Sequence, residues 1–357
     1  MIVACMKAIL LAGGQGTRLR PLTLNTPKPI VPIFNRPFLH YQIDLLKQVP
    51  EIDEVILSLN YQPQRIEEIF GDGSALGIGI RYVVEPRPLG TGGAVKYAAD
   101  GLTESVVVFN GDVLTQIDLA AVIRMHRDRR ARATIVLTPV DNPTAYGLVE
   151  TDAHANVRRF LEKPRADEIT TNHINAGIYV LEPDTFDRMP AGVSCSIERE
   201  YFPSLVERGE TFVAHVYPGY WIDIGTSEKY IQVHRDIMDG RFVAAPFQDV
   251  APATKAVSPG ARIDGAAVVE GPCFIDEGAV IKAGARIGPY SVIGRGTEVD
   301  EGASVAGAIL WPRCHVSREA TVSNAILGRN CYLGRSVSVD GAAVLGDNTT
   351  LTDYTRT

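Results

Sequence analysis

Basic side chains at fixed offsets around a glycine-rich loop are the first feature of the chain that could do chemistry. The loop reads GGQGT from Gly13 to Thr17, with Arg18 directly after it and Lys28 ten residues beyond Arg18, between two prolines. Glycines leave room for backbone N–H groups to approach a polyphosphate closely, because no Cβ intervenes. The spacing favours phosphate binding over the alternative of a plain strand-to-helix turn.

Two familiar phosphate-binding motifs do not fit this loop. A P-loop requires G-x-x-x-x-G-K-[ST], and no lysine stands at the corresponding place. A dinucleotide-binding fingerprint requires a third glycine where Leu19 stands, and an acidic residue at the end of the second strand, where Asn60 stands. Any phosphate binding is therefore expected to follow another pattern.

Further motifs follow the loop in order, and together they carry a family resemblance. They read EPRPLGTGG from Glu85, NGD from Asn110, YGLV from Tyr146, FLEKP from Phe160, NAGIY from Asn175 and WIDIG from Trp221. With the loop and its Pro27-Lys28-Pro29, they resemble the sugar nucleotidyltransferases, also called NDP-sugar pyrophosphorylases. The stretch SIERE from Ser196 and the C-terminal repeats are most similar to the mannose-1-phosphate guanylyltransferase branch, and the similarity covers essentially the whole chain.

The resemblance implies an enzyme that joins a nucleoside triphosphate to a sugar-1-phosphate and releases pyrophosphate. The sugar phosphate has a second pKa of about 6, so its attacking oxygen is already ionised and needs no general base. The difficulty is repulsion, at about 1 kcal/mol per charge pair at 4 Å in water and about 4 kcal/mol at an effective dielectric constant of 20. Catalysis is therefore expected to rest on positioning and on cations that line the site.

By the same resemblance, particular residues take particular roles. Arg18 and Lys28 are expected to hold the triphosphate and Lys163 the sugar phosphate, while Asp112 and Asp223 hold Mg²⁺, a hard cation that suits carboxylates and phosphate oxygens. The residues expected to bind the nucleotide are Leu11, Ala12, Gly13, Gly14, Gly16, Thr17, Glu85, Gly90, Thr91 and Gly92. Those expected to bind the sugar phosphate are Asn110, Gly147, Glu162, Lys163 and Asn175.

The choice of base and sugar rests on fewer residues. GTP and mannose-1-phosphate are favoured, with the Glu85 carboxylate able to accept from N1–H and N2–H₂ of guanine. The family's guanylyltransferases more often carry serine where Gly111 stands, and its thymidylyl- and uridylyltransferases share Asn-Gly-Asp. Thymidylyl or uridylyl transfer to glucose-1-phosphate therefore stays open. A catalytically silent regulatory subunit also stays open, although the key side chains are all present: Arg18, Lys28, Asp112, Lys163 and Asp223.

The elements that must position these residues alternate up to about residue 240. Strands are predicted at residues 8–11, 54–59, 80–85 and 105–110, and helices after Pro37 and around Ile66, Ile69 and Phe70. This order predicts a Rossmann-like α/β domain with a mostly parallel sheet, whose ligands lie beyond the carboxyl ends of the strands.

A six-residue period then replaces this alternation. Aliphatic residues recur from Val257 to Val305, slip by one position to Leu310, and slip again to Leu327. Small residues follow four positions after most of them, and Cys273, Cys314 and Cys331 occupy such small positions. The pattern predicts a left-handed β-helix of hexapeptide repeats. We expect a catalytic domain at residues 1–244, a linker at 245–254 and the β-helix at 255–357.

Hexapeptide repeats also build acyltransferases with a catalytic histidine, and this half of the chain holds one, His315. It lies near a register slip, where a structural role is at least as well supported. We instead expect the β-helix to mediate homo-oligomer formation through its flat faces and edges.

Composition narrows the partners. The net charge is −7, with both signs interspersed, so neither nucleic acid nor anionic membrane is an expected partner. No apolar run approaches the ~20 residues that span a bilayer. Five cysteines without a CxxC pair suit a reducing cytoplasm. Residues 1–5 precede the Met-Lys-Ala at Met6 and are expected to be a short extension.

Overall fold

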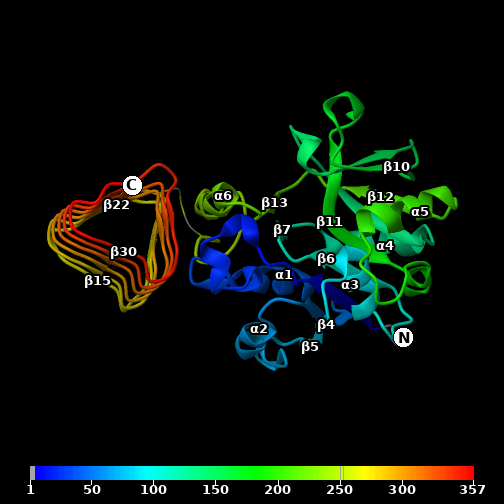
Figure 1. Cartoon of the computed structure of the whole chain (residues 1–357), viewed down its shortest axis with the longest axis horizontal. Coiled ribbons are helices and arrows are strands. Elements are labelled where there is room, and N and C mark those ends of the chain that lie inside the picture. Colours follow the sequence, from blue (N-terminus) through cyan, green and yellow to red (C-terminus); the bar gives the residue numbers. More distant parts are fainter. Residues whose placement is uncertain (1–4, 250, 252) are drawn as a thin grey trace. The chain divides into compact units, whose positions relative to one another are not determined.

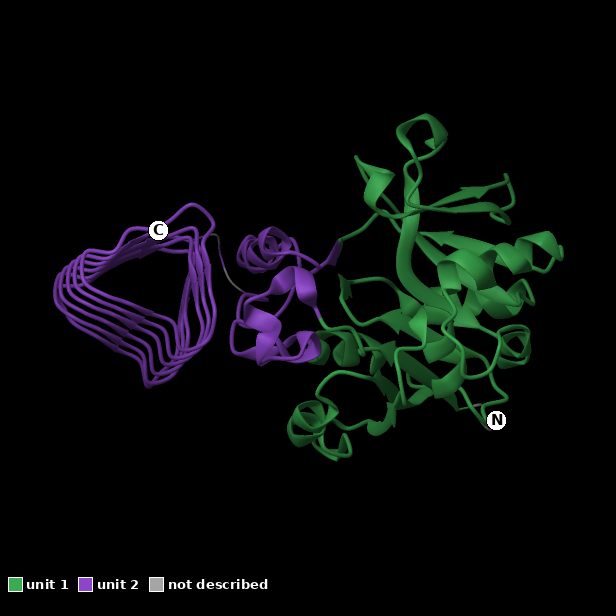
Figure 2. Ribbon diagram, viewed as in Figure 1, with its two compact units in different colours: residues 1–15, 39–221 green, residues 16–38, 222–357 purple. Residues whose placement is uncertain are grey.

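The structure is a computed structural model that describes residues 5–249, 251 and 253–357. The chain divides into two compact units (Figure 2), which are described separately. The sheet unit comprises residues 1–15 and 39–221, and the β-helix unit comprises residues 16–38 and 222–357. Of the predicted extension at residues 1–5, all but Cys5 lies outside the described residues.

Parallel strands make up one side of the sheet (Figure 1). β1 (Met6–Leu11) lies between β4 (Ile52–Leu59) and β6 (Val106–Asn110), and β5 (Gly79–Val84) flanks β4. These are the four predicted strands, and their order and direction confirm the Rossmann-like prediction. Their carboxyl ends meet at one edge, so the residues that follow them come close together.

Antiparallel pairing extends the other side, so the sheet as a whole is mixed. The order continues β6-β11-β9-β10, and β8 pairs antiparallel with β11 and parallel with β12. The bounds are β8 (Ala133–Pro139), β9 (Gly147–Thr151), β10 (Val157–Glu162), β11 (His173–Leu181) and β12 (Phe212–Val216), with the short β7 at Val113–Thr115. The residues predicted to bind the sugar phosphate lie on these added strands or at their ends, except Asn110, which is the last residue of β6.

Helices of the sheet unit bury apolar faces against this sheet. They are α1 (Phe38–Leu46), α2 (Pro63–Phe70), α3 (Gly90–Ala98), α4 (Leu119–Asp128) and α5 (Phe202–Glu207). The predicted helix after Pro37 begins at Phe38, and in α2 Ile66 and Phe70 are buried as expected while Ile69 is 47% exposed. Asp118 caps α4 by accepting the Ala121 N–H at 2.9 Å. Within the described chain, every helix is too short or too polar to cross a lipid bilayer.

The C-terminal part of the β-helix unit consists of three parallel sheets whose short strands stack coil upon coil (Figure 1). The first sheet contains β14 (Lys255–Val257), β17 (Cys273–Ile275), β20 (Ser291–Ile293), β23 (Ile309–Leu310), β26 (Ile326–Leu327) and β29 (Val344–Leu345). The second contains β15 (Arg262–Ile263), β18 (Val280–Ile281), β21 (Glu298–Val299), β24 (His315–Val316), β27 (Tyr332–Leu333) and β30 (Thr350–Leu351). The third contains β16 (Val268–Val269), β19 (Arg286–Ile287), β22 (Ser304–Ala306), β25 (Thr321–Ser323) and β28 (Ser338–Val339). The predicted left-handed β-helix is confirmed.

The two register slips in the repeat shorten two coils by one residue without breaking the aliphatic ladder. Ile275 pairs with Ile293 eighteen positions later, whereas Ile293 pairs with Leu310 seventeen positions later, and Leu310 with Leu327 likewise. The three cysteines at small positions are buried in the interior of this ladder, where a small side chain is what fits. The prediction that these cysteines occupy small positions of the repeat is therefore confirmed.

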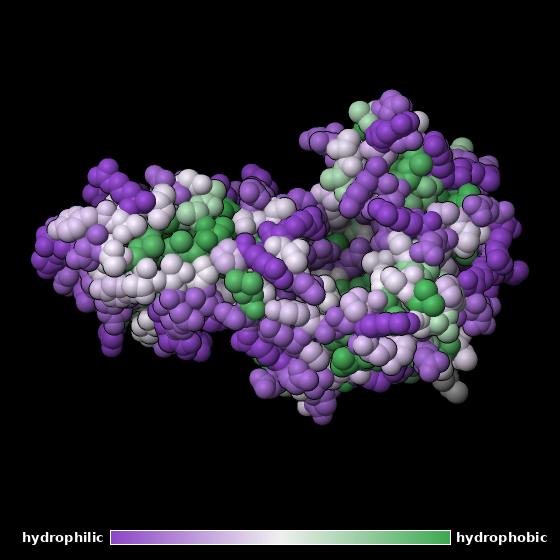
Figure 3. Space-filling model, in the orientation of Figure 1, coloured by the Kyte–Doolittle hydropathy of each residue, from purple (hydrophilic) through white to green (hydrophobic). Residues whose placement is uncertain are grey.

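The rest of the β-helix unit consists of residues 16–38, which we call the loop segment, and residues 222–254. The loop segment contains three short 3₁₀ turns and a small hairpin of β2 (Pro32–Ile33) and β3 (Arg36–Pro37). β13 (Trp221–Asp223) leads into α6 (Ser227–Met238), whose first turn is capped by the Thr226 hydroxyl. On the face shown in Figure 3, apolar residues lie in patches among hydrophilic ones.

Candidate functional site

The glycine-rich loop leaves the sheet where β1 ends between its two parallel neighbours. Leu11 pairs with Ser58 and Asn110, and the Ala12 N–H donates to the Ser58 carbonyl at 2.9 Å. A Cβ added to Gly13 would lie 3.1 Å from the Asn60 nitrogen, whereas one added to Gly14 would meet no heavy atom within 4 Å. The loop therefore starts tightly packed on the strand ends and opens at Gly14, as a phosphate-binding backbone requires.

Glu85 follows the end of β5 and is buried against this loop. A Cβ added to Gly13 would lie 3.2 Å from Glu85 Oε1. This oxygen accepts a hydrogen bond from the Ser58 hydroxyl at 3.3 Å. Glu85 Oε2 accepts the Leu89 N–H at 2.9 Å. Burial raises the pKa of the Glu85 carboxyl, and these two hydrogen bonds partly oppose that rise. Glu85 thus holds the turn that leads into α3, a role that the sequence did not indicate.

The glycines at the start of α3 pack closely against the segment around Cys195. Gly90 has φ +70°, and a Cβ there would lie 2.6 Å from the Cys195 carbonyl oxygen. The Gly92 N–H donates to that same oxygen at 2.9 Å. Thr91 accepts the Ile197 N–H at 2.9 Å and donates to Glu198 at 2.7 Å. The structure therefore uses all three residues to join α3 to the SIERE motif.

On the sugar side, a glycine and a carboxylate lie face to face across two strands. Gly147 at the start of β9 pairs with Glu162 at the end of β10, and a Cβ on Gly147 would come within 3.0 Å of Glu162 Oε2. Burial raises the pKa of the Glu162 carboxyl, and the neighbouring Glu198 carboxylate raises it further. Lys163 and Arg199 act in the opposite direction. The two carboxylates therefore share a half-buried space with two cations.

Asn175 and Asn110 extend this cluster. β11 has an irregularity between Asn175 and Tyr179, and the Asn175 side chain bridges it by accepting the Gly177 N–H at 2.9 Å and donating to the Tyr179 hydroxyl at 2.8 Å. Gly177 has φ +73°, and a Cβ there would lie 2.8 Å from Asn110 Nδ2. The predicted sugar-binding residues Asn110, Gly147, Glu162 and Asn175 are thus brought to one region of the sheet unit.

Lys163 has an unusual backbone conformation for a non-glycine residue. Its φ is +54°, and its N–H donates to the Tyr146 carbonyl at 2.9 Å, directly after β10 ends. The left-handed region is uncommon for non-glycine residues and is found preferentially at functional sites. This geometry turns the chain at the end of a strand, next to Glu162.

In the β-helix unit, the predicted cation Arg18 lies beside the predicted metal ligand Asp223. A Cβ added to Gly225 would lie 2.7 Å from Arg18 Nη2 and 3.0 Å from Asp223 Oδ2, so both groups converge on this glycine. Asp223 is only 9% exposed and forms an ion pair with Lys229 in the first turn of α6. Lys229 was missed from the sequence, because a lysine in a helix is ordinarily a solvated surface residue.

Lys28 lies close to Arg18 in the same unit. Arg18 is on the 3₁₀ turn Thr17–Leu19, which begins after Gly16 at φ +60°. A Cβ on Gly16 would meet Lys28 Cβ at 3.2 Å and Thr23 Cγ2 at 3.1 Å, and the Thr23 hydroxyl donates to the Gly16 carbonyl at 2.8 Å. Glycine at this position thus allows the stem of Lys28 to pack onto the turn that carries Arg18.

The carboxylates expected to hold a metal differ in their surroundings. Asp112 follows the end of β6 in the sheet unit, where the Gly111 N–H donates to the Leu11 carbonyl at 3.0 Å. Asp223 in the β-helix unit already faces Lys229 and Arg18. Both supply oxygen donors, which is the ligand type that Mg²⁺ prefers.

A different group of potential ligands lies on the outside of the β-helix. Among the described residues, Glu298, Asp300 and His315 place ligand atoms within 4.8 Å of one another. Asp300 already pairs with Lys282 at 2.7 Å and with His315 Nε2 at 2.8 Å. His315 is therefore bonded to Asp300, which also pairs with Lys282, and the three residues lie on adjacent coils at the surface. These contacts support a structural role for His315.

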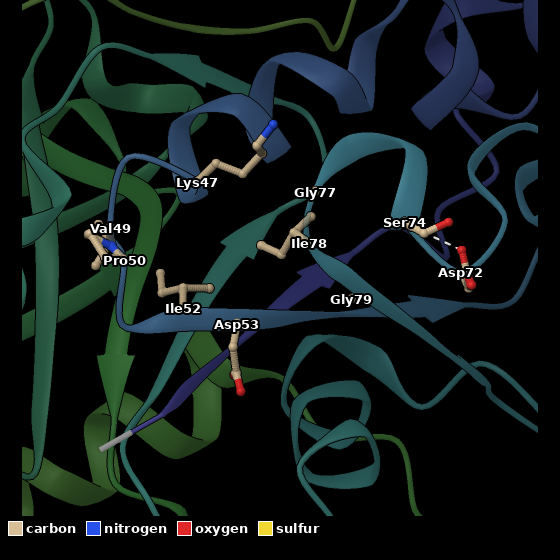
Figure 4. A pocket seen from close by; sticks show the side chains of 10 residues that line it. All are labelled: Lys47, Val49, Pro50, Ile52, Asp53, Asp72, Ser74, Gly77, Ile78 and Gly79. Carbon is tan, nitrogen blue, oxygen red and sulfur yellow. Dashed lines mark hydrogen bonds between the residues drawn. The ribbon is translucent and has the colours of Figure 1, made fainter. Parts of the chain in front are cut away.

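A cavity of 540 Å³ in the sheet unit lies at the amino-terminal ends of β4 and β5 (Figure 4). Its lining includes Ile52 and Gly79, the first residues of β4 and β5, whereas the predicted site follows the last residues of the strands. Among the described residues that line it, Lys47 is the one cation, against the carboxylates of Asp53 and Asp72. Such a lining does not suit a polyanion, so we do not assign this cavity to the nucleotide.

Comparison with known proteins identifies the class. Residues 7–240 match the nucleotidyl transferase family, and residues 269–356 match the GMPPB C-terminal domain. The chain belongs to the nucleotidyl transferase family and is a nucleotidyltransferase enzyme.

Its relatives narrow the class further. The chain is 39% identical over 306 residues to the mannose-1-phosphate guanylyltransferase of Mycobacterium tuberculosis, which covers 85% of this chain and 79% of that relative. It is also 39% identical over 322 residues to the probable mannose-1-phosphate guanylyltransferase 1 of Oryza sativa subsp. japonica, covering 88% and 81% of the two chains. Among solved structures, HddC from Yersinia pseudotuberculosis complexed with GMP-PN is similar, with a TM-score of 0.56 and 30% identity, over 65% of this chain and 99% of that one.

Proposed function

We propose that this chain transfers GMP from GTP to mannose-1-phosphate, forming GDP-mannose and releasing pyrophosphate. The observation that carries the proposal is the convergence of the Arg18 guanidinium and the Asp223 carboxylate on Gly225, with Lys28 on the neighbouring turn. Relatives named for this reaction and a solved relative complexed with GMP-PN support the choice of substrates.

The phosphate chemistry follows from charge. The sugar phosphate oxygen is already largely ionised at neutral pH, so the attack on the α-phosphorus needs no base. Arg18 and Lys28 bind the triphosphate and stabilise the negative charge that develops on the departing pyrophosphate. Lys163 binds the sugar phosphate and reduces its repulsion from the triphosphate.

The sugar is bound on the sheet unit. The Glu162 carboxylate accepts hydrogen bonds from sugar hydroxyls, and Gly147 leaves the space into which the sugar fits, because a side chain there would press on Glu162 and Phe160. Asn110 and Asn175 offer amide groups from the same region. Glu198 is a further carboxylate that faces this space, and it accepts a hydrogen bond from the Thr91 hydroxyl at 2.7 Å.

The base is assigned to the surroundings of Glu85. Its two oxygens accept from Ser58 and Leu89, and a carboxylate has about four lone-pair sites, so each oxygen can accept once more. The N1–H and N2–H₂ of guanine match these two acceptors. A Glu85→Gln variant is expected to lose its preference for GTP over dTTP and UTP. An unchanged preference would show that Glu85 only holds the turn before α3.

Asp112 and Asp223 would hold Mg²⁺ together with phosphate oxygens. When bound, the ion supplies positive charge that neutralises the polyphosphate and orients its leaving group. The Lys229 ammonium pairs with Asp223 Oδ1. With the ion bound, Lys229 would either keep this pairing and leave the other carboxylate oxygen to the ion, or give up Asp223 to the ion. Purified protein treated with a chelator is expected to lose transfer activity and to regain it with Mg²⁺.

Further features complete the proposal. We assign the catalytic domain to residues 1–244, the linker to residues 245–254 and the β-helix to residues 255–357. The β-helix forms the contacts of a homo-oligomer, and the enzyme acts in the cytoplasm, where the thiols of its buried cysteines stay reduced.

One assay tests the proposal directly. Pyrophosphate release is measured for GTP, dTTP, UTP, ATP and CTP, each with mannose-, glucose- and N-acetylglucosamine-1-phosphate. The highest kcat/KM is expected for GTP with mannose-1-phosphate. A maximum for dTTP or UTP with glucose-1-phosphate would identify the alternative reaction, and no release from any pair would indicate a regulatory subunit. Thiol release from acetyl-CoA with an amino-sugar phosphate would instead point to the acyltransferase alternative.

A further inference from the structure

Lys28 lies between two buried anchor points in the loop segment. Thr26, two residues before it, and the carbonyl of Pro32, four residues after it, both bind side chains that come from distant parts of the chain. Around Lys28 the segment has the 3₁₀ turns Leu22–Leu24 and Lys28–Ile30, followed by the two-residue strands of the β2–β3 hairpin. Its position therefore depends on these tertiary contacts rather than on a sheet ladder.

The first anchor is Arg329, from a coil of the β-helix. Its Nη1 donates to the hydroxyl of the fully buried Thr26 at 2.5 Å. The guanidinium lies over the Trp311 ring, 4.7 Å from its centroid, and the backbone N–H of Arg329 donates to the Asp347 carboxylate at 2.7 Å. Stacking and hydrogen bonding together hold the planar guanidinium in one orientation.

The second anchor runs from Trp311 through α6. The Trp311 indole N–H donates to the Tyr230 hydroxyl at 3.0 Å, and that hydroxyl donates to the Pro32 carbonyl. Tyr230 is fully buried and Trp311 is 2% exposed. Each buried donor in this series has an acceptor, so removing any member leaves a buried polar group without its partner, which destabilises this arrangement.

We propose that Trp311 and Arg329 are positioning residues for nucleotidyl transfer, which set the place of Lys28 through Thr26 and Pro32. This rests on the proposed function, in which Lys28 holds the triphosphate. The two anchors meet at one point, because Arg329 stacks on the same Trp311 ring that binds Tyr230. The β-helix thus contributes to the catalytic site as well as to the fold and to any assembly.

The experiment compares Arg329→Gln and Trp311→Phe with the wild-type chain. The first removes the cation above the ring, and the second keeps the ring but removes its N–H. Arg335→Gln is the matched control, since Arg335 lies one repeat further on and pairs only at the surface with Glu319. We expect kcat/KM for GTP to fall about 10- to 100-fold in the first two variants and to stay near the wild-type value in the control, because misplacement by about 1 Å can lower a rate 100-fold.

A double-mutant cycle separates positioning from general destabilisation. If Arg329 acts through Lys28, Arg329→Gln is expected to change kcat/KM less than about 3-fold in a Lys28→Gln background, because the group that it positions is absent. Arg329→Lys is expected to restore part of the activity, since an ammonium still donates to Thr26 and lies over the ring. Equal losses in both backgrounds would overturn the proposal.

Hydrogen exchange keeps the proposal testable if no substrate pair reacts. The Ile30 and Val31 N–H groups bond within the turn that carries Lys28, to Pro27 and Lys28 at 3.0 and 3.1 Å. Faster exchange at these positions is expected in Arg329→Gln and Trp311→Phe than in Arg335→Gln. Equal exchange in all three would overturn the anchoring, whereas a failed substrate matrix with faster exchange would overturn only the proposed function.

Discussion

The predicted sugar-binding residues of the sheet unit and the predicted phosphate-binding residues of the β-helix unit are supported in opposite ways. On the sugar side, Gly147 and Glu162 belong to adjacent strands, and the hydrogen-bond ladder of the sheet sets their separation. On the phosphate side, Arg18 and Lys28 lie on 3₁₀ turns of the loop segment, which side chains from α6 and the β-helix contact at Pro32 and Thr26. The backbone of the sheet therefore supports the sugar side, and individual side chains support the phosphate side.

This difference determines how each side can fail. A site on a sheet tolerates the loss of one hydrogen bond, because the ladder remains, but it has no room for added atoms. A site on a loop has room for added atoms, but the position of the loop depends on a few side-chain contacts, so the loss of one of them has a large effect. Substitutions that remove atoms are therefore expected to harm the phosphate side most, and substitutions that add atoms are expected to harm the sugar side.

The largest effect is expected from removing a cation on the phosphate side. Arg18→Ala should lower kcat about 100- to 1,000-fold, the range seen when a single group that stabilises transition-state charge is lost. Arg20→Ala is the control, since Arg20 is an exposed arginine on the same segment. Steady-state pyrophosphate release gives both values. Equal rates for the two variants would remove Arg18 from the mechanism.

A smaller and more selective effect is expected from adding one carbon on the sugar side. In Gly147→Ala the new Cβ would come within 2.7 Å of the Phe160 ring and 3.0 Å of Glu162 Oε2. KM for mannose-1-phosphate should rise about 10-fold, a change of about 1.4 kcal/mol, while KM for GTP stays within about 2-fold. Gly265→Ala is the matched control, because its Cβ would meet no atom within 4 Å. A parallel rise in both KM values would contradict a separate sugar side.

The same contrast explains which parts of the molecule the sequence could predict. Strands, the hexapeptide ladder and the small positions of Cys273, Cys314 and Cys331 follow from short periods, which are local properties of the chain. The register slips at Leu310 and Leu327 were also visible, because the ladder must stay continuous when a coil loses one residue.

Contacts between distant residues could not be predicted in this way. Tyr230 and Pro32 are 198 positions apart, and Arg329 and Thr26 are 303 apart. No periodicity connects such pairs, and each member alone reads as an ordinary core or surface residue. The same holds for Lys229 beside Asp223. Thr91 and Glu85 were expected only at the nucleotide, and their additional bonds to Glu198 and Leu89 became apparent only in the fold.

The last effect, on stability and not on activity, is expected at a buried histidine that supports the loop segment. His234 Nδ1 lies 2.8 Å from the Tyr230 carbonyl, and Nε2 lies 3.1 Å from the Phe34 N–H. A carbonyl requires a donor and an N–H requires an acceptor, so the ring is neutral with its proton on Nδ1. Burial lowers the pKa of His234 to about 4, and the bond to Tyr230 opposes this only in part.

Stability should therefore fall on mild acidification. Between about pH 6.5 and about pH 4 the unfolded chain binds a proton at His234 that the folded chain does not, so this residue lowers the free energy of unfolding as the pH falls through that range. At pH 5.5 the free energy of unfolding is lower by about 1.4 kcal/mol, and above about pH 7 the titration of His234 does not change it. His234→Gln keeps a donor and an acceptor but does not titrate. Urea unfolding at pH 7.5 and 5.5 should show the wild type losing about 1.4 kcal/mol more than this variant, and equal losses would mean that His234 is protonated in the folded state.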